Sequence, residues 1–303
     1  MINNDDSAAQ SRADIEYGPL PAHKLDLHIP QAASARPADA PFPLVVFVHG
    51  GAWRSEDKAD HAQLAARIAL RTQCCVAVPN YRLSLRDTAV NPEDAVYHPM
   101  HAQDVLNALA FLGPAPQPDP DSESDNELAK AIDAPYDPRR IFLIGHSCGA
   151  HILSSIFLDS SASTPELTPP SSLISSVRGI ALSEGIFDVD LLLSSFPMYR
   201  AWFIVNAFGD RDSYEQFNAT NYPLREGGKH IHWLVIQSPN DTLVDGKQAE
   251  SMYEHLKELG THSKHGDTVL KDWSTITSEH NEMLKTTEYS DLIGNWINSL
   301  HFH

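Results

Sequence analysis

Cysteine, basic charge and long apolar runs are all scarce in this chain of 303 residues. Its three cysteines, Cys74, Cys75 and Cys148, are an odd number that includes an adjacent pair, so no disulfide framework is predicted. No stretch of about eighteen residues is uninterruptedly apolar, which excludes a predicted transmembrane helix. Residues 1–14 are polar and acidic and lack the basic and apolar regions of a signal peptide. We therefore expect a cytoplasmic location.

Acidic residues outnumber basic ones by 40 to 22, which gives a formal net charge of −18. This charge disfavours binding to nucleic acid or to an anionic membrane. Part of it lies in residues 114–137, which are interpreted as a solvated surface insertion. The sixteen histidines show no spacing typical of a metal site. We interpret them as scattered surface residues and predict neither a metal nor another cofactor.

The most informative motif is Gly-His-Ser-Cys-Gly at residues 145–149, directly after the apolar run 141–144. A Gly-x-Ser-x-Gly pattern between a buried strand and a helix is typical of a strained turn that exposes a serine hydroxyl. Glycine is needed on both sides because a Cβ there would collide with the neighbouring strand or helix. An ordinary turn would explain the pentad alone. Its context indicates that Ser147 is a nucleophile.

A second motif, His-Gly-Gly-Ala-Trp at residues 49–53, follows the apolar run 44–48. Acyl transfer develops negative charge on an oxygen, and backbone N–H groups of small residues approach such an oxygen closely. We predict that the amides of Gly51, Ala52 and Cys148 form this oxyanion hole. Trp53 is a candidate wall of the substrate pocket, and a purely structural role suits it equally. Together the two motifs favour an α/β-hydrolase fold.

The rest of the chain alternates strand-like and helix-like segments, which indicates a mostly parallel central sheet with helices on both faces. Strands are predicted at residues 25–29, 44–48, 74–78, 141–144, 177–182, 231–236 and 268–273. Helices are predicted at residues 62–70, 100–112, 149–158, 247–259 and 290–300. We expect a single domain over residues 1–303, in which the aromatic-rich stretch 188–229 forms a small lid or cap.

A nucleophilic serine needs a histidine base and an acid, which follow it in the order acid, then histidine. In open α/β sheets the site lies beyond the carboxyl ends of the strands. Asp241 lies in the turn after the predicted strand 231–236 and is the best candidate for the acid. Glu184, directly after the strand 177–182, is the reserve candidate. Asp245 is better placed to cap the following helix.

His280 is the predicted base. It follows the predicted strand 268–273 by a short polar loop, which places it beyond the carboxyl end. His262 and His265 precede that strand and would lie at the opposite edge of the sheet. His301 and His303 belong to the tail.

Several stretches together resemble the kynurenine formamidase (arylformamidase) branch of the α/β-hydrolases. The resemblance covers most of the chain and rests on residues 49–53, 145–151, 183–188, 240–244 and 280–282. It implies a triad of Ser147, Asp241 and His280 that hydrolyses N-formyl-kynurenine to kynurenine and formate, in tryptophan catabolism. The chain departs from the branch at Cys148, where alanine is usual. Neighbouring esterase branches, including enzymes similar to prenylcysteine methylesterases, share nearly the same two motifs.

Three functions remain open on this basis. The first is an arylformamidase, the second a carboxylesterase of short acyl or methyl esters, and the third a non-catalytic binding protein, which an intact triad disfavours. The expected partner is a small-molecule substrate, with a homodimer as one candidate assembly. For Cys148 the sequence suggests either a reactive thiol activated by a helix N-terminus or a small apolar residue packed on the sheet.

Overall fold

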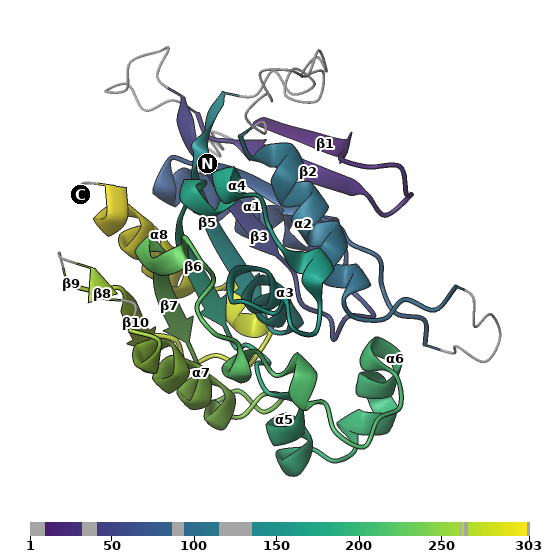
Figure 1. The fold of residues 1–303 in the computed structure, drawn as a ribbon. Coiled ribbons are helices and arrows are strands. Elements are labelled where there is room, and N and C mark those ends of the chain that lie inside the picture. Colours follow the sequence, from purple (N-terminus) through teal and green to yellow (C-terminus); the bar gives the residue numbers. More distant parts are fainter. Residues whose placement is uncertain are drawn as a thin grey trace, which may run out of the picture.

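The protein is built on an eight-stranded sheet with the strand order β1-β2-β4-β3-β5-β6-β7-β10 (Figure 1). The computed structural model describes residues 10–31, 41–86, 94–114, 135–260, 262–263 and 266–301. Only β1 with β2 and β2 with β4 pair antiparallel, and all other neighbours in this sheet are parallel. The strands are β1 (Gln10–Glu16), β2 (Lys24–Ile29), β3 (Phe42–Val48), β4 (Cys75–Pro79), β5 (Tyr136–His146), β6 (Val177–Ser183), β7 (His232–Ile236) and β10 (Val269–Asp272). A separate hairpin pairs β8 (His262–Ser263) with β9 (Gly266–Asp267).

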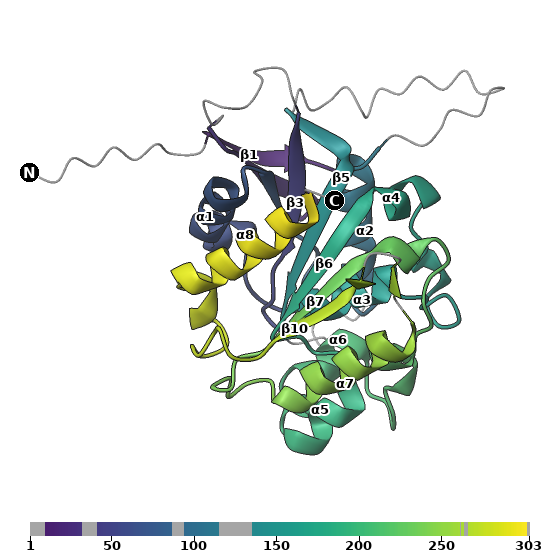
Figure 2. The ribbon, with the colours of Figure 1, turned by 90° about the vertical axis from the view of Figure 1, so that its left-hand side faces the viewer.

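Helices cover both faces of the sheet, which confirms the predicted fold class. In Figure 2, α1 and α8 lie on one side of the sheet, and α2, α3 and α4 lie on the other. The helices are α1 (Ala62–Thr72), α2 (Met100–Leu112), α3 (Cys148–Phe157), α4 (Ser171–Ser176), α5 (Val189–Ser195), α6 (Val205–Phe208), α7 (Gly246–Glu258) and α8 (Thr287–His301). Of these, α2 has the predicted bounds, whereas α4, α5 and α6 lie outside the predicted helices. No helix in the described segments has the length and apolar character needed to cross a membrane.

The central strands are apolar throughout because they are buried on both faces. Along β3, Leu44, Val46 and Val48 belong to the larger core cluster, whereas Val45 and Phe47 belong to the cluster under α1 and α8. Side chains of a strand alternate between its two faces, so each face receives every second residue. Each fully buried side chain of this kind contributes about 1.5–3 kcal/mol. The apolar residues of each central strand therefore pack against the helices on both faces of the sheet.

Within the eight-stranded sheet, β1 and β5 differ most from the prediction. Strand β1 lies at the edge of the sheet, where most of its side chains are exposed and leave no apolar alternation to detect. Strand β5 begins at Tyr136 rather than at residue 141, because Phe42 of β3 pairs with Tyr136 and extends the parallel ladder. The predicted surface insertion at residues 114–137 lies mostly outside the described residues.

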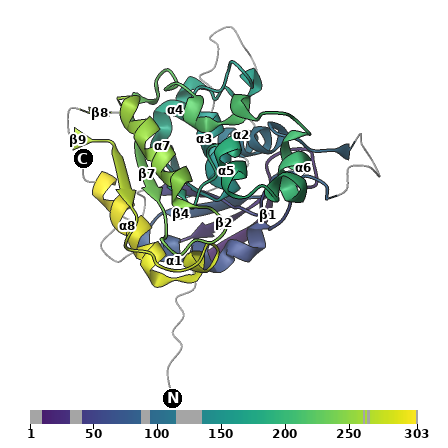
Figure 3. The same ribbon diagram turned by 90° about the horizontal axis from the view of Figure 1, so that it is seen from below.

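The cap segment, which we define as residues 188–229, contains α5, a π-helical turn (η5, Arg200–Ile204) and α6. Figures 1 and 3 show α5 and α6 packed at one end of the molecule. Most of its aromatic rings are buried, as expected for core packing, whereas Trp202 is 53% exposed. Whether this segment opens and closes as a lid stays a prediction.

The histidines are not scattered over the surface, and that interpretation was wrong. Nine of them are buried in the part of the chain that the structure describes: His23, His28, His49, His61, His98, His101, His146, His151 and His280. Several make aromatic contacts, as His98 does with Phe208 and Phe217 at ring-centroid distances of 5.3 Å. Burial lowers the pKa of His49 and His151 to about 4 and that of His101 to about 3. These imidazoles are neutral parts of the core.

This burial predicts that mild acid destabilises the fold. Below pH 6.5 these histidines bind protons in the unfolded chain but stay unprotonated in the folded protein. The free energy of unfolding therefore decreases as the pH is lowered. Each such group adds a slope that approaches about 1.4 kcal/mol per pH unit. Urea unfolding at pH 7.5, 6.5, 5.5 and 5.0 measures this effect. A midpoint that stays constant over this range would contradict it.

Candidate active site

Ser147 occupies a strained turn between β5 and α3. Its backbone has φ 54° and ψ −121°, in a region that residues other than glycine rarely adopt. A Cβ on Gly145 would lie 2.7 Å from the backbone nitrogen of Ala150, and one on Gly149 would lie 2.2 Å from the carbonyl oxygen of Val48. Both flanking glycines are therefore sterically required, as the pentad predicts. The turn leaves Ser147 lining a cavity.

The structure joins the predicted base and acid by a short hydrogen bond. His280 Nδ1 lies 2.7 Å from Asp241 Oδ2, and the other carboxylate oxygen of Asp241 accepts the N–H groups of Leu243 and Val244 at 2.8 and 3.0 Å. Asp241 follows β7 and His280 follows β10, which are adjacent and parallel. Their carboxyl ends therefore meet at one edge of the sheet. His280 lines the same cavity as Ser147.

Glu184, the reserve candidate for the acid, also reaches the base. Its Oε2 lies 3.5 Å from His280 Nδ1, and its Oε1 accepts the N–H of Ser238 at 2.7 Å. The side chain is fully buried, and the backbone is left-handed with φ 52°. Two carboxylates thus face one imidazole nitrogen, with Asp241 at the shorter distance. Asp245 stands at the N-cap of α7, but its carboxylate accepts from the Ser195 hydroxyl rather than from the helix.

The motif at residues 49–53 forms a tight turn against the nucleophile. Gly51, Ala52 and Trp53 all have positive φ angles, of 87°, 53° and 58°. A Cβ on Gly51 would lie 2.2 Å from the Ser55 carbonyl oxygen, so this position requires glycine. Gly51 and Ala52 line the cavity with Ser147. Cys148 begins α3, so its backbone N–H lies at the helix N-terminus beside the nucleophile.

Trp53 does not line the cavity, which corrects its assignment as a pocket wall. Its side chain is fully buried, and its ring packs edge-on against Phe208 of α6 and His151 of α3 at 4.9 and 5.4 Å. The left-handed turn directs the indole into the core between the sheet and the cap segment. Of the two roles that the sequence allows for Trp53, its burial and ring contacts fit the structural one.

Cys148 is a packed, neutral thiol. It is fully buried, its sulfur accepts the N–H of Trp53 at 3.2 Å, and the Tyr81 hydroxyl lies 3.7 Å away. Burial raises the pKa of this thiol to about 12, against the opposite influence of these contacts. The expectation of a thiol activated by the helix N-terminus is therefore wrong, because desolvation outweighs the helix dipole.

We predict that iodoacetamide at pH 7.5 spares the activity of the wild type and of Cys148→Ala alike. Alkylation requires the thiolate, which a pKa of about 12 keeps scarce at this pH. Cys148→Ala removes only a small packed group and should keep its activity within about tenfold, since loss of such packing costs about 1 kcal/mol. The measurement is residual hydrolysis against time of treatment. Rapid inactivation of the wild type alone would contradict the prediction.

The cavity beside Ser147 is largely apolar. Its lining consists of Gly51, Ala52, Ser55, Glu56, Ser147, Ile186, Tyr199, Trp202, Phe203, Leu243, Val244, His280 and Asn281. Three of the aromatic rings come from the cap segment. Among the described lining residues there is no lysine or arginine, and the ionisable side chains besides Tyr199 are Glu56 and His280.

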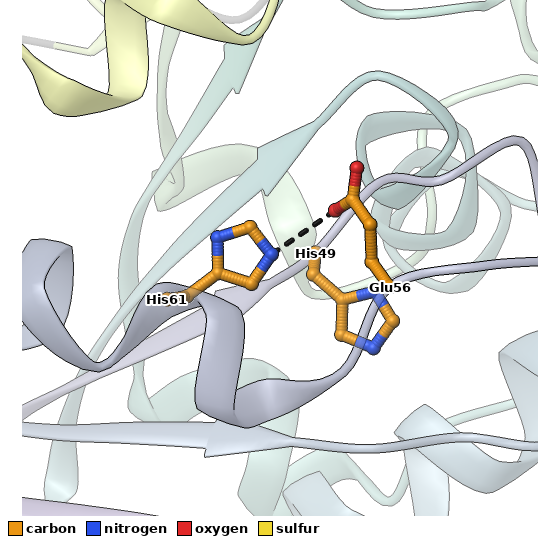
Figure 4. A group of neighbouring side chains, drawn as sticks. All are labelled: His49, Glu56 and His61. Carbon is orange, nitrogen blue, oxygen red and sulfur yellow. Dashed lines mark hydrogen bonds and ion pairs between the residues drawn. The ribbon is translucent and has the colours of Figure 1, made fainter.

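Two groups of described side chains place atoms of the kind that bind metals within 4.8 Å of one another: Glu184 with Asp241 and His280, and His49 with Glu56 and His61. The first group is the acid and base already described. In the second, His61 Nε2 lies 3.0 Å from Glu56 Oε2, as Figure 4 shows, and His49 Nδ1 lies 3.2 Å from the Gly50 carbonyl oxygen. Because the hydrogen bonds between His61 and Glu56 and between His280 and Asp241 already use one pair of these atoms in each group, we assign no metal to either group.

Comparison with known proteins gives relatives of two enzymatic kinds. Over 218 residues the chain is 25% identical to a kynurenine formamidase of Meyerozyma guilliermondii, which covers 70% of this chain and 71% of that protein. It is 23% identical to a kynurenine formamidase of Danio rerio, with coverage of 90% and 78%. It is 29% identical to a probable isoprenylcysteine alpha-carbonyl methylesterase of Oryza sativa subsp. japonica, covering 84% of this chain but only 58% of that protein.

Solved structures of esterases share the fold. Esterase B from Lactobacillus rhamnosis superimposes with a TM-score of 0.69 at 16% identity, over 97% of this chain and 88% of that one. A truncated carbohydrate esterase from gut microbiota gives a TM-score of 0.68 at 16% identity and covers 99% of both chains. The alpha/beta hydrolase fold family matches residues 45–265, which include Ser147 and Asp241. The chain therefore belongs to the alpha/beta hydrolase fold family.

Proposed function

We propose that this protein is a serine hydrolase in which Ser147 is the nucleophile, His280 the general base and Asp241 the acid. The observation that carries the proposal is the cavity shared by Ser147 and His280, together with the 2.7 Å hydrogen bond from His280 to Asp241. The strained backbone of Ser147 supports it, because such strain is a feature of nucleophile turns. The relatives support a hydrolase of either amides or esters.

In this mechanism His280 removes the proton of Ser147 as the serine oxygen attacks the carbonyl carbon of the substrate. Asp241 keeps Nδ1 of His280 protonated and stabilises the imidazolium that forms. The amides of Gly51, Ala52 and Cys148 stabilise the tetrahedral oxyanion. As this intermediate collapses, His280 protonates the departing amine or alcohol. Water then attacks the acyl-enzyme by the same steps, which releases the acid and restores Ser147.

The substrate that we propose is N-formyl-kynurenine, which gives kynurenine and formate. Relatives from three organisms are named kynurenine formamidases. A formyl group is the smallest acyl group, and an aniline is a better leaving group than an alkyl amine. The aromatic side chains of the cap segment that line the cavity suit an aryl leaving group.

A carboxylesterase acting on short acyl or methyl esters is the second candidate. The observation that favours it is the cavity lining, in which the described residues include no lysine or arginine to pair with the carboxylate of a kynurenine. The methylesterase relative from rice is consistent with this alternative.

The test is a side-by-side measurement of kcat/KM for N-formyl-kynurenine and for a short aryl ester such as phenyl acetate. We expect the formamide to be the better substrate, and a clear preference for the ester would favour the second candidate. Ser147→Ala should lower kcat by about 10⁴-fold or more on both, since the nucleophile and its base act as a unit. Substantial hydrolysis by a pure Ser147→Ala preparation would remove Ser147 from this role.

The two carboxylates at His280 should differ in their importance. Asp241→Asn should lower kcat by about 10⁴-fold because it favours the wrong imidazole tautomer. Glu184→Gln should lower kcat by about 10- to 100-fold, the effect of losing one weaker interaction with a charged group. The measurement is kcat for each variant after circular dichroism has shown that it is folded. A larger loss in Glu184→Gln than in Asp241→Asn would reverse the assignment of the acid.

A further inference from the structure

Glu56 is a carboxylate that faces the cavity and takes no part in the chemistry described above. It lies three residues beyond the motif at residues 49–53 and lines the same cavity as Ser147. Its backbone is left-handed, with φ 73°, which is unfavourable for a residue with a side chain. Such strain persists only where the surroundings hold a residue in place, and it marks positions that serve a ligand more often than ordinary loops.

One carboxylate oxygen of Glu56 is held and the other is left for a ligand. Oε2 lies 3.0 Å from His61 Nε2, whereas Figure 4 shows the second oxygen directed away from both His61 and His49. Within the described parts of the chain this second oxygen has no hydrogen-bond partner. Burial alone would raise the pKa of Glu56, but the hydrogen bond from His61 and the neighbouring imidazoles outweigh it and hold the pKa below its usual value. The group is therefore ionised at neutral pH.

An aromatic wall lines the same cavity as Glu56. We define it as Tyr199, Trp202 and Phe203 of the cap segment, all of which line the cavity with Glu56. Their ring centroids lie 5.0–5.5 Å apart, and their planes are inclined by 45–71°. Aromatic faces attract cations, and a carboxylate in the same cavity adds the opposite charge. The combination is suited to an organic ammonium group.

We propose that Glu56 and the aromatic wall form a subsite for an ammonium group of the substrate. This inference rests on the proposed hydrolase function and adds that the preferred substrates carry a primary or quaternary amine beyond the scissile bond. An amine of this kind donates to the free oxygen of Glu56 or packs against the rings. No lysine or arginine lies among the described lining residues to pair with this carboxylate, and the net charge of −18 favours the approach of cations.

Stabilising the charge on His280 is an alternative role for Glu56, and it predicts a different dependence of activity on the substrate. Because Glu56 lies near enough to His280 to interact with its charge, it would stabilise the imidazolium formed during catalysis. That effect would act on every substrate equally, whereas an ammonium subsite acts only on substrates that carry the cation. A pair of substrates that differ only in the ammonium group separates the two roles.

The first experiment compares kcat/KM for N-formyl-kynurenine and for its deamino analogue, 4-(2-formamidophenyl)-4-oxobutanoate. Glu56→Gln keeps an oxygen for His61 and removes the charge, while Glu254→Gln removes an exposed charge of α7 outside the cavity. We expect Glu56→Gln to lose about 10- to 100-fold on the ammonium substrate, the usual effect of a hydrogen bond to a charged group, with little change on the analogue. Glu254→Gln should change neither. Equal losses on both substrates would overturn the subsite.

The second experiment measures binding without turnover, so it tests the ammonium subsite separately from the proposed hydrolase function. Calorimetry measures the binding of phenyltrimethylammonium to the wild type, Glu56→Gln and Glu254→Gln. We expect binding to the wild type and to Glu254→Gln, weakened about tenfold or more in Glu56→Gln. Failure of the wild type to bind this cation would overturn the subsite. Binding of the cation by a folded protein that hydrolyses neither formamide nor ester would support the subsite and reject the proposed function.

Discussion

The close approach of two loops is the constraint on which the rest of the site depends. The start of α3 presses so closely on the end of β3 that a Cβ on Gly149 would lie 2.2 Å from the Val48 carbonyl oxygen. Likewise, a Cβ on Gly50 would lie 3.0 Å from the Cβ of Ser147. Because β3 and β5 are parallel neighbours, the loops that follow them emerge side by side. Glycine alone permits this contact, which brings the predicted oxyanion hole to the predicted nucleophile.

The strand order then supplies the remaining groups. Ser147, Glu184, Asp241 and His280 follow β5, β6, β7 and β10, four consecutive neighbours that run parallel. Their carboxyl ends form a single edge, so residues separated by more than a hundred positions in the chain converge there. Glu184 follows β6, the strand between those that precede the serine and the acid, which explains why it reaches the same imidazole nitrogen as Asp241. The cap segment adds aromatic side chains to the cavity at this edge.

Desolvation keeps several buried ionisable side chains near the cavity neutral. Cys148 stands at a helix N-terminus, yet its burial raises the thiol pKa to about 12. Burial also keeps His49 and His151 neutral. Glu56 is the contrasting case, because it is only partly buried and hydrogen-bonded by His61, and it stays ionised. The cavity therefore combines apolar lining residues with one ionised carboxylate that faces no lysine or arginine of the described lining.

The sequence by itself determined the fold class, most of the strands and helices, and the pairing of the two glycine motifs. It did so because buried parallel strands are short apolar runs, and because steric crowding restricts the turn residues to glycine. The position of each candidate relative to its strand also favoured Asp241 as the acid and selected His280 over His262 and His265 as the base. The roles of Asp241 and His280 in catalysis are proposals.

Only the tertiary structure decided which side chains face the cavity and which are buried. Trp53 and Cys148 lie in or beside the motifs, yet both turn into the core, while Glu56 and Trp202 lie outside the motifs and line the cavity. The buried histidines and the exposed edge strand β1 were missed for the same reason. Burial and proximity depend on contacts between distant segments, and residue type and local spacing carry no record of those contacts.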